Sequence, residues 1–146
     1  MKTPLSSFQK LFAYLLFFIS GFCALVYEVV WGRMLVLVMG NTTLATTTIL
    51  TAFMAGLSLG GLYWGVRVDK AKRSPLFLFG CLEAGIGLSA IIVSQIIWMI
   101  VPLGAWISQL SGSESFVQIM TRFLLCFSVL IVPTFLMGGT LAVIGR

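Results

Sequence analysis

The sequence predicts an all-α integral membrane protein that folds as a four-transmembrane-helix bundle. Hydrophobic residues make up 60% of the 146 residues and charged residues only 9%, which excludes an ordinary soluble domain of this size. Four apolar stretches are each long enough to cross a hydrocarbon core of about 30 Å, which needs about 20 helical residues. Because backbone amides in lipid must be paired internally, we expect these stretches to be helices within a single membrane domain, residues 1–146. The predicted spans are Leu11–Val30, Thr43–Val66, Leu76–Val101 and Phe116–Phe135.

The first stretch, Leu11–Val30, contains only two strongly polar side chains, Ser20 and Glu28. Its apolar run is longer than the roughly 7–15 residues of a cleaved signal peptide, so we expect a retained helix. After Val30, the segment 31–39 either continues this helix at a tilt or lies as a short segment at the outer surface of the membrane.

Small residues recur at four-residue steps in the second and third stretches. The first row is Thr48, Ala52, Gly56 and Gly60, with Gly61 and Gly65 beside it. The third stretch has one row of Gly80 and Ala84 and another of Cys81, Gly85 and Ser89. Small residues let helix backbones approach closely in lipid, so these rows predict helix packing within the bundle. A sliding seam in a transporter fits the same pattern.

The fourth stretch contains Pro133, and Gly138 and Gly139 follow it. Proline deletes one helical hydrogen bond and glycine loosens the backbone, so we expect the helix to break near this point. The remaining segment, Thr140–Ile144, is apolar but too short to cross a membrane.

The distribution of basic residues predicts the topology. Lys2 and Lys10 precede the first stretch and four basic residues lie in the segment 67–73, whereas the segment 102–115 has none. The positive-inside rule therefore predicts a cytoplasmic N-terminus and C-terminus in the cell (inner) membrane, with multiple passes. The net charge of +5 reflects this topology and is no evidence for nucleic-acid binding.

Three ionisable side chains inside the predicted spans form a candidate polar site: Glu28, Glu83 and Arg122. A charge near the centre of a membrane helix costs about 2.5–3.5 kcal/mol. We expect Glu28 and Arg122 at similar depth in the outer leaflet, where an ion pair would relieve the desolvation of both. Alternatively, Arg122 extends to the headgroups and Glu28 lies there beside Arg33.

Glu83 lies about eight residues inside the third stretch and should point into the bundle. It is either a neutral polar residue bonded between helices, to Ser58 or Ser20, or a binding site for a cation or proton. The three cysteines lie within spans at no metal-like spacing, and the chain has no histidine. We therefore predict no catalytic residue, no cofactor and no metal site.

Four blocks of sequence carry a family resemblance. They are SGFCALVYEVVWGRML at Ser20–Leu35, TAFMAGLSLGGLYWG at Thr51–Gly65, FGCLEAGIGLSA at Phe79–Ala90 and VPTFLMGGTLAV at Val132–Val143. In this order they resemble the N-terminal membrane region of spermidine synthase-like proteins, also called fused major-facilitator/spermidine synthase proteins.

The loop after the second span also resembles the major-facilitator signature between helices two and three. Gly65, Asp69, Lys70, Arg73 and Pro75 loosely fit its G-x-x-x-D-[RK]-x-G-x-[RK] pattern, with Lys72 where a glycine is usual. The resemblance implies a cytoplasmic latch formed by Asp69 and Arg73, with Asp69 as its acid.

In this family such helices precede further spans and a soluble Rossmann-like domain that transfers an aminopropyl group to an amine. The chain has no glycine-rich turn after a strand and only four acids, so we expect a noncatalytic membrane module, truncated after its fourth helix. Its expected partners are the lipid bilayer and either further membrane helices, an aminopropyltransferase-like domain or a second copy. The alternatives are part of a major-facilitator-like transporter for polyamines or other small cations, and a gene fragment.

Overall fold

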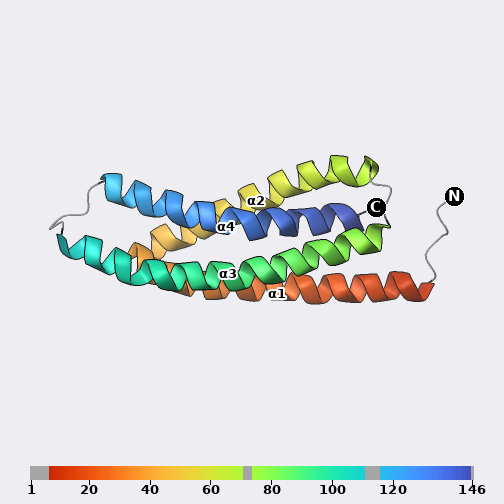
Figure 1. Cartoon of the computed structure of the whole chain (residues 1–146), viewed down its shortest axis with the longest axis horizontal. Helices are drawn as coiled ribbons and strands as arrows, with labels where there is room; N and C mark the ends of the chain where they lie inside the picture. The colour runs from red at the N-terminus through yellow and green to blue at the C-terminus, as the bar shows by residue number, and fades with distance from the viewer. Residues whose placement is uncertain (1–6, 71–73, 111–115, 146) are drawn as a thin grey trace.

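The chain folds into four long helices, as the sequence predicts. The computed structural model describes residues 7–70, 74–110 and 116–145. The helices are α1 (Ser7–Met39), α2 (Thr42–Lys70), α3 (Pro75–Leu110) and α4 (Phe116–Ile144) (Figure 1). Each is long and apolar enough to cross a membrane.

All four helices run further than the spans expected from the sequence, and three of the extensions change an interpretation. α1 continues without interruption through the segment 31–39, so this segment is no separate interfacial element. α3 passes through Pro102, where the sequence suggested a loop, and ends at Leu110. α4 passes through Pro133 and ends at Ile144, so the expected break is wrong and the segment Thr140–Ile144 is its last turn.

The turn around Pro133 is held by the side chain of the next residue, Thr134, and by contact with α2. The Thr134 Oγ1 hydroxyl lies 2.8 Å from the carbonyl oxygen of Leu130 and 3.1 Å from that of Ile131, on the same helix. It also lies 3.3 Å from the carbonyl oxygen of Ala52 on α2. Membrane helices tolerate proline where a hydroxyl and a packed neighbouring helix support the weakened turn.

The reversal between α1 and α2 is sharp because each helix end is capped locally. Gly40 has φ 69°, the left-handed conformation that favours glycine, and its N–H donates to the Val36 carbonyl at 2.9 Å. Asn41 Oδ1 then accepts hydrogen bonds from the backbone N–H groups of Thr43 (2.8 Å) and Leu44 (3.3 Å). These contacts satisfy amides at the start of α2 that have no partner within the helix.

Successive helices run in opposite directions, so α1 is parallel to α3 and α2 is parallel to α4 (Figure 1). α4 contacts all three other helices, and its contact with α2 is the most extensive in the bundle. α1 and α3 lie side by side, and α1 begins at the same end of the bundle at which α4 finishes.

The row of small residues on α2 lies directly against α4. A Cβ added to Gly56 would collide with the Thr134 side chain, and one added to Gly60 would collide with the backbone carbonyl of Phe135. From the opposite side, a Cβ on Gly138 would collide with the Leu57 carbonyl oxygen. The two backbones are therefore in direct contact, as small residues permit in a membrane.

The other small residues divide into packed and open positions. Gly61 is near the contact, since a Cβ there would lie 3.8 Å from the Gly138 carbonyl oxygen. On α3, a Cβ on Gly85 would lie 3.2 Å from Leu136 Cδ1 of α4. Gly65 and Gly80 have no such neighbour within 4 Å. Proximity to α4 therefore decides which small residues pack.

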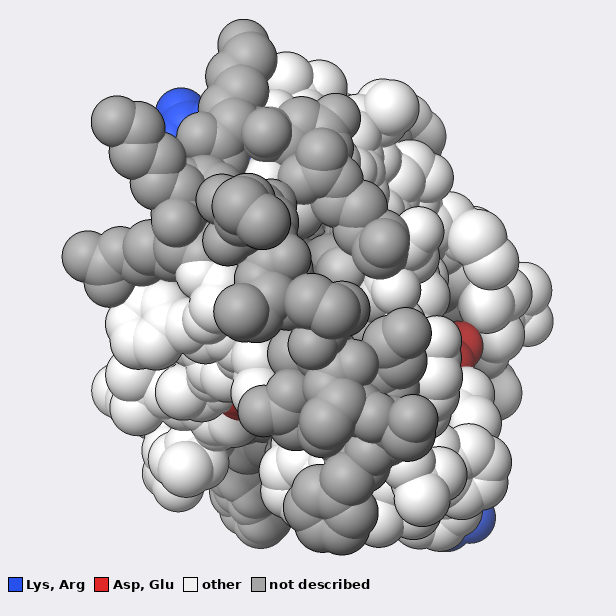
Figure 2. Space-filling model, turned by 90° about the vertical axis from the view of Figure 1, so that its right-hand side faces the viewer, with Lys and Arg blue, Asp and Glu red and all other residues white. Residues whose placement is uncertain are grey.

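Burial is uneven among the helices. In their most apolar windows, 44% of the residues of α4 are buried but only 6% of those of α1. Among the α1 side chains that the structure describes, the buried ones lie in the second half of the helix: Trp31, Leu35, Val38 and Met39. Seen from the end at which α1 begins, the surface of the described residues is largely uncharged, with isolated basic and acidic spots (Figure 2).

Replacing Gly60 by alanine tests the backbone contact. We expect Gly60→Ala to destabilise the protein by about 1–3 kcal/mol, because the added methyl group must push α4 away at a rigid carbonyl. The measurement is the unfolding free energy in mixed detergent micelles.

Gly65→Ala is the matched control on the same helix, since nothing lies within 4 Å of its added methyl group. Alanine has the higher helix propensity, so this variant should be neutral or up to about 1 kcal/mol more stable. Equal destabilisation by the two substitutions would contradict the contact.

Candidate functional site: a groove between α1 and α3

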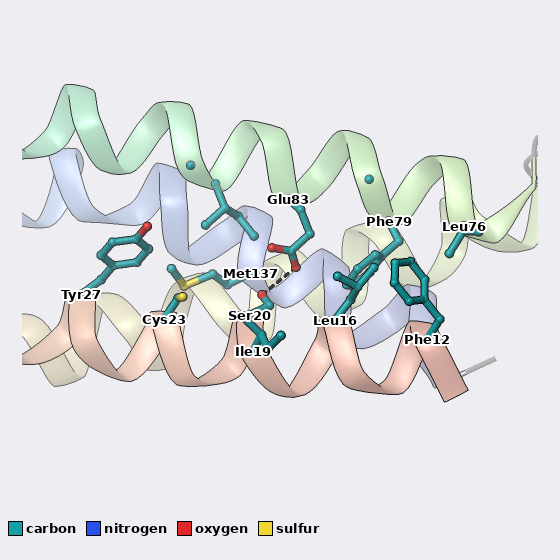
Figure 3. A pocket seen from close by; sticks show the side chains of 13 residues that line it. Phe12, Leu16, Ile19, Ser20, Cys23, Tyr27, Leu76, Phe79, Glu83 and Met137 are labelled. Atoms are coloured by element: carbon teal, nitrogen blue, oxygen red, sulfur yellow. Dashed lines mark hydrogen bonds between the residues drawn. The ribbon is translucent and has the colours of Figure 1, made fainter. Parts of the chain in front are cut away.

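A half-open groove with a volume of about 370 Å³ runs between α1 and α3, and Met137 of α4 also lines it (Figure 3). Its walls are mainly aliphatic and aromatic. The lining residues are Phe12, Leu16, Ile19, Ser20, Cys23 and Tyr27 from α1, and Leu76, Phe79, Gly80, Glu83, Ile86 and Gly87 from α3.

The polar centre of the groove is the pair Ser20 and Glu83. Ser20 Oγ donates a hydrogen bond of 2.6 Å to Glu83 Oε1, and Figure 3 shows the two side chains pointing toward each other. Of the two hydroxyls that the sequence suggested for Glu83, Ser20 is therefore the one in contact, while Ser58 is exposed on α2. Glu83 lies eight residues after the start of α3, about 12 Å along the helix.

A second hydrogen bond joins the same two helices. Trp31 Nε1 donates to Ser94 Oγ at 3.4 Å, and Ser94 Oγ itself donates to the Ala90 carbonyl at 2.9 Å. The two interhelical pairs share a sequence separation of 63 residues. Ser20 and Trp31 are 11 residues apart on α1, and Glu83 and Ser94 are 11 residues apart on α3. Because 11 residues make about three helical turns, both pairs lie on the same face of each helix. Together they define a single register for two parallel helices.

Tyr27 lines the groove and stacks on Trp31, one helical turn further along α1. The rings of Tyr27 and Trp31 stack with centroids 5.4 Å apart and planes inclined by 14°. Trp31 also packs against Phe53 of α2, with centroids 6.3 Å apart. Trp31 is fully buried and therefore ties α1 to both α2 and α3.

The groove offers a ligand a hydrogen-bond acceptor, the carboxyl group of Glu83, and no positively charged side chain. Glu83 is the only acidic residue among its lining residues, and none of them is Lys or Arg. Within the described residues, Oε2 of Glu83 accepts no hydrogen bond, so it is available to a donor or cation. No three His, Cys, Asp or Glu side chains of the described residues gather closely enough to hold a metal ion.

Glu28 lies deeper than the sequence suggested. Because α1 continues to Met39, Glu28 is 11 residues from the end of the helix, about 16 Å. It lies near the middle of the candidate span Tyr14–Met39 and is partly buried. It does not line the groove.

Arg122 is separated from Glu28 along the bundle. Ile119 and Phe123, on either side of Arg122 in sequence, line a small cavity together with Met39 at the end of α1. This puts Arg122 close to the α1–α2 reversal. The ion pair between Glu28 and Arg122, and their similar depth in a membrane, stay predictions.

The predicted cytoplasmic latch cannot be followed in the structure. Asp69 belongs to the last turn of α2, but its side chain lies outside the described residues, as does all of Arg73. The latch stays a prediction.

Sequence reasoning did not single out Trp31 and Ser94, the second pair that joins α1 to α3. A signal for them existed, since Ser20 and Trp31 have the same 11-residue spacing as Glu83 and Ser94. That spacing has meaning only when α1 and α3 are known to be neighbours.

With these features, the chain is defined as a four-helix protein suited to crossing a membrane several times. Comparisons with known protein families, curated proteins and solved structures find no match. The resemblance to spermidine synthase-like proteins therefore stays a prediction.

A double-mutant cycle between Ser20→Ala and Glu83→Leu tests the central contact of the groove. We expect a coupling energy of about 0.6–1.7 kcal/mol, the range measured for interhelical hydrogen bonds in membranes. The same cycle for Trp31→Phe and Ser94→Ala should give a smaller coupling energy, because the Trp31–Ser94 bond is 3.4 Å long and the Ser20–Glu83 bond 2.6 Å. Zero coupling at Ser20 and Glu83, measured by unfolding in mixed micelles, would contradict the described geometry.

Proposed function

We propose that the chain is a noncatalytic module of the cell (inner) membrane that assembles with further helices or with an aminopropyltransferase-like domain. The four sequence blocks that resemble spermidine synthase-like proteins suggest the kind of partner. The observation that carries the assembly itself is the position of Glu28, a partly buried carboxyl near the middle of an apolar span.

A carboxyl at this depth needs a polar or protein environment. Ionisable residues inside membrane helices almost always face a bundle interior or a watery cavity. Glu28 lies on α1, the helix with the smallest buried share, and outside the groove. An additional helix packed beside α1 would enclose this carboxyl and cover apolar side chains that α1 leaves exposed, such as Val29 and Leu25.

The proposed orientation places both chain termini in the cytoplasm. It is supported by the four basic residues of the segment 67–73, which follow the second span, and by the absence of Lys and Arg between residues 102 and 115. An aminopropyltransferase-like domain would then meet the module on the cytoplasmic side, at the end where α4 finishes.

A second candidate function is transport of a polyamine or another small cation. Glu83 favours it, because this carboxyl has an oxygen without a hydrogen bond from the described residues and lies in a groove about 12 Å along α3. Four helices would need a partner or a second copy to complete a pathway.

Native copurification tests the assembly. We expect a tagged chain, extracted in mild detergent, to retain a partner whose sequence contains a glycine-rich Rossmann segment or further membrane spans. Glu28→Leu should lower recovery of this complex about tenfold, which corresponds to about 1.4 kcal/mol, while Glu28→Gln keeps a polar group and retains more of it.

Val30→Leu is the matched control, since it changes an exposed apolar residue two positions away and should not alter recovery. A chain that purifies without any partner, or a complex that tolerates Glu28→Leu fully, would overturn the proposal. A partner without a Rossmann segment would remove the link to aminopropyl transfer.

The transport alternative makes a different prediction. Glu83→Gln keeps the size of the side chain but removes its charge, so uptake of labelled putrescine into vesicles containing the assembled protein should fall at least tenfold. Normal unfolding behaviour of the variant is the control. Unchanged uptake, or no uptake by the unsubstituted protein, would exclude this function.

A further inference from the structure

We propose that the groove between α1 and α3 binds one unbranched alkyl chain that carries a protonated amine, with the ammonium group on Glu83. The inference goes beyond the proposed function, because it depends on the shape and charge of the groove and on neither Glu28 nor the family resemblance.

The dimensions of the groove favour a single chain as the ligand. Along α1 it extends from Phe12 to Tyr27, a rise of about 22 Å. An α-helix with its side chains is about 10–12 Å wide, so over this length it would occupy roughly 2,000 Å³, several times the groove volume of about 370 Å³. An unbranched alkyl chain is far thinner than a helix.

The open space comes from two glycines on α3. Gly80 and Gly87 line the groove on either side of Glu83 in the sequence, and neither would bring a Cβ within 4 Å of another residue. This differs from Gly56 and Gly60 on α2, whose missing side chains are replaced by α4. The glycines of the groove therefore leave room that the protein itself does not fill.

The polar atoms of the groove select the headgroup. Glu83 and Ser20 form its centre, and no Lys or Arg lines it to attract an anion. Oε2 of Glu83 accepts no hydrogen bond from the described residues, so an ammonium N–H has an acceptor ready. A fatty acid would instead place its carboxylate against Glu83 and be repelled.

The route of entry lies through the bilayer. Phe12, Ile19 and Cys23 of α1 and Leu76 and Gly80 of α3 line the groove and are all exposed on the outside of the bundle. In a membrane this surface faces lipid chains, so a chain-bearing amine can slide in sideways. The aliphatic and aromatic walls then hold the chain while Glu83 holds its charged end.

Dodecylamine is the probe that tests this site. The full chain, in nanodiscs of zwitterionic lipid, is heated with increasing dodecylamine, dodecanol or dodecanoate. We expect saturable stabilisation by dodecylamine, with Kd at least tenfold lower than for dodecanol, and none by dodecanoate. Glu83→Gln should raise the Kd for dodecylamine at least tenfold, and Ser20→Ala should raise it less.

A pair of glycine variants separates the groove from general effects on the membrane. Gly87→Leu puts a side chain into the groove one helical turn after Glu83, keeps the carboxyl group itself, and should abolish the stabilisation. Gly21→Leu adds the same side chain to α1 at an exposed position outside the groove, where an added Cβ also has nothing within 4 Å. This variant should still be stabilised by dodecylamine. Helix content by circular dichroism shows whether each variant is folded.

Three results would overturn the proposal. One is equal stabilisation of the Gly87→Leu and Gly21→Leu variants by dodecylamine, which would indicate that the amine partitions nonspecifically into the lipid. Another is equal affinity for dodecanol and dodecylamine, which would make the groove a general site for lipid chains. The third is stabilisation by an added lysine-bearing transmembrane peptide but not by dodecylamine, which would assign the groove to a partner helix.

Discussion

The direct contact between the backbones of α2 and α4 is the constraint on which the rest of the bundle depends. Lipid removes most of the hydrophobic driving force between helices, so close van der Waals packing must supply the association. Gly56 and Gly60 on α2 and Gly138 on α4 provide it, because none has a Cβ to hold the helices apart. The parallel orientation of the two helices follows from the alternating chain direction, and α4 thereby becomes the central helix that contacts all the others.

α1 is attached to this centre in a different way. Its second half is anchored by buried Trp31, whereas its first half touches α3 through Ser20 and leaves most of its apolar surface exposed. Two hydrogen bonds with the same separation of 63 residues align α1 with α3, whose backbones have fewer close contacts than those of α2 and α4. The groove between them is the consequence, since Gly80 and Gly87 lie where a larger side chain would fill the gap.

The two carboxyls of α1 and α3 therefore have separate surroundings. Glu83 lines a groove and accepts a hydrogen bond from Ser20, whereas Glu28 lies outside the groove near the middle of its span. Each placement is costly in lipid unless the carboxyl meets a polar partner. The proposed binding of an amine at Glu83 and the proposed helix beside Glu28 would relieve these two costs independently.

The sequence by itself determined that the chain is helical, where its four apolar segments lie and that small residues line α2, because span length and composition are local properties. It could not predict that α4 continues through Pro133, since Thr134 and the packed α2 support that turn only in the folded bundle. The sequence also could not predict how far Glu28 lies from the end of its helix, because that distance depends on where α1 ends. Tertiary structure alone decided that Ser20 meets Glu83, since pairing residues 63 positions apart requires the register of two parallel helices.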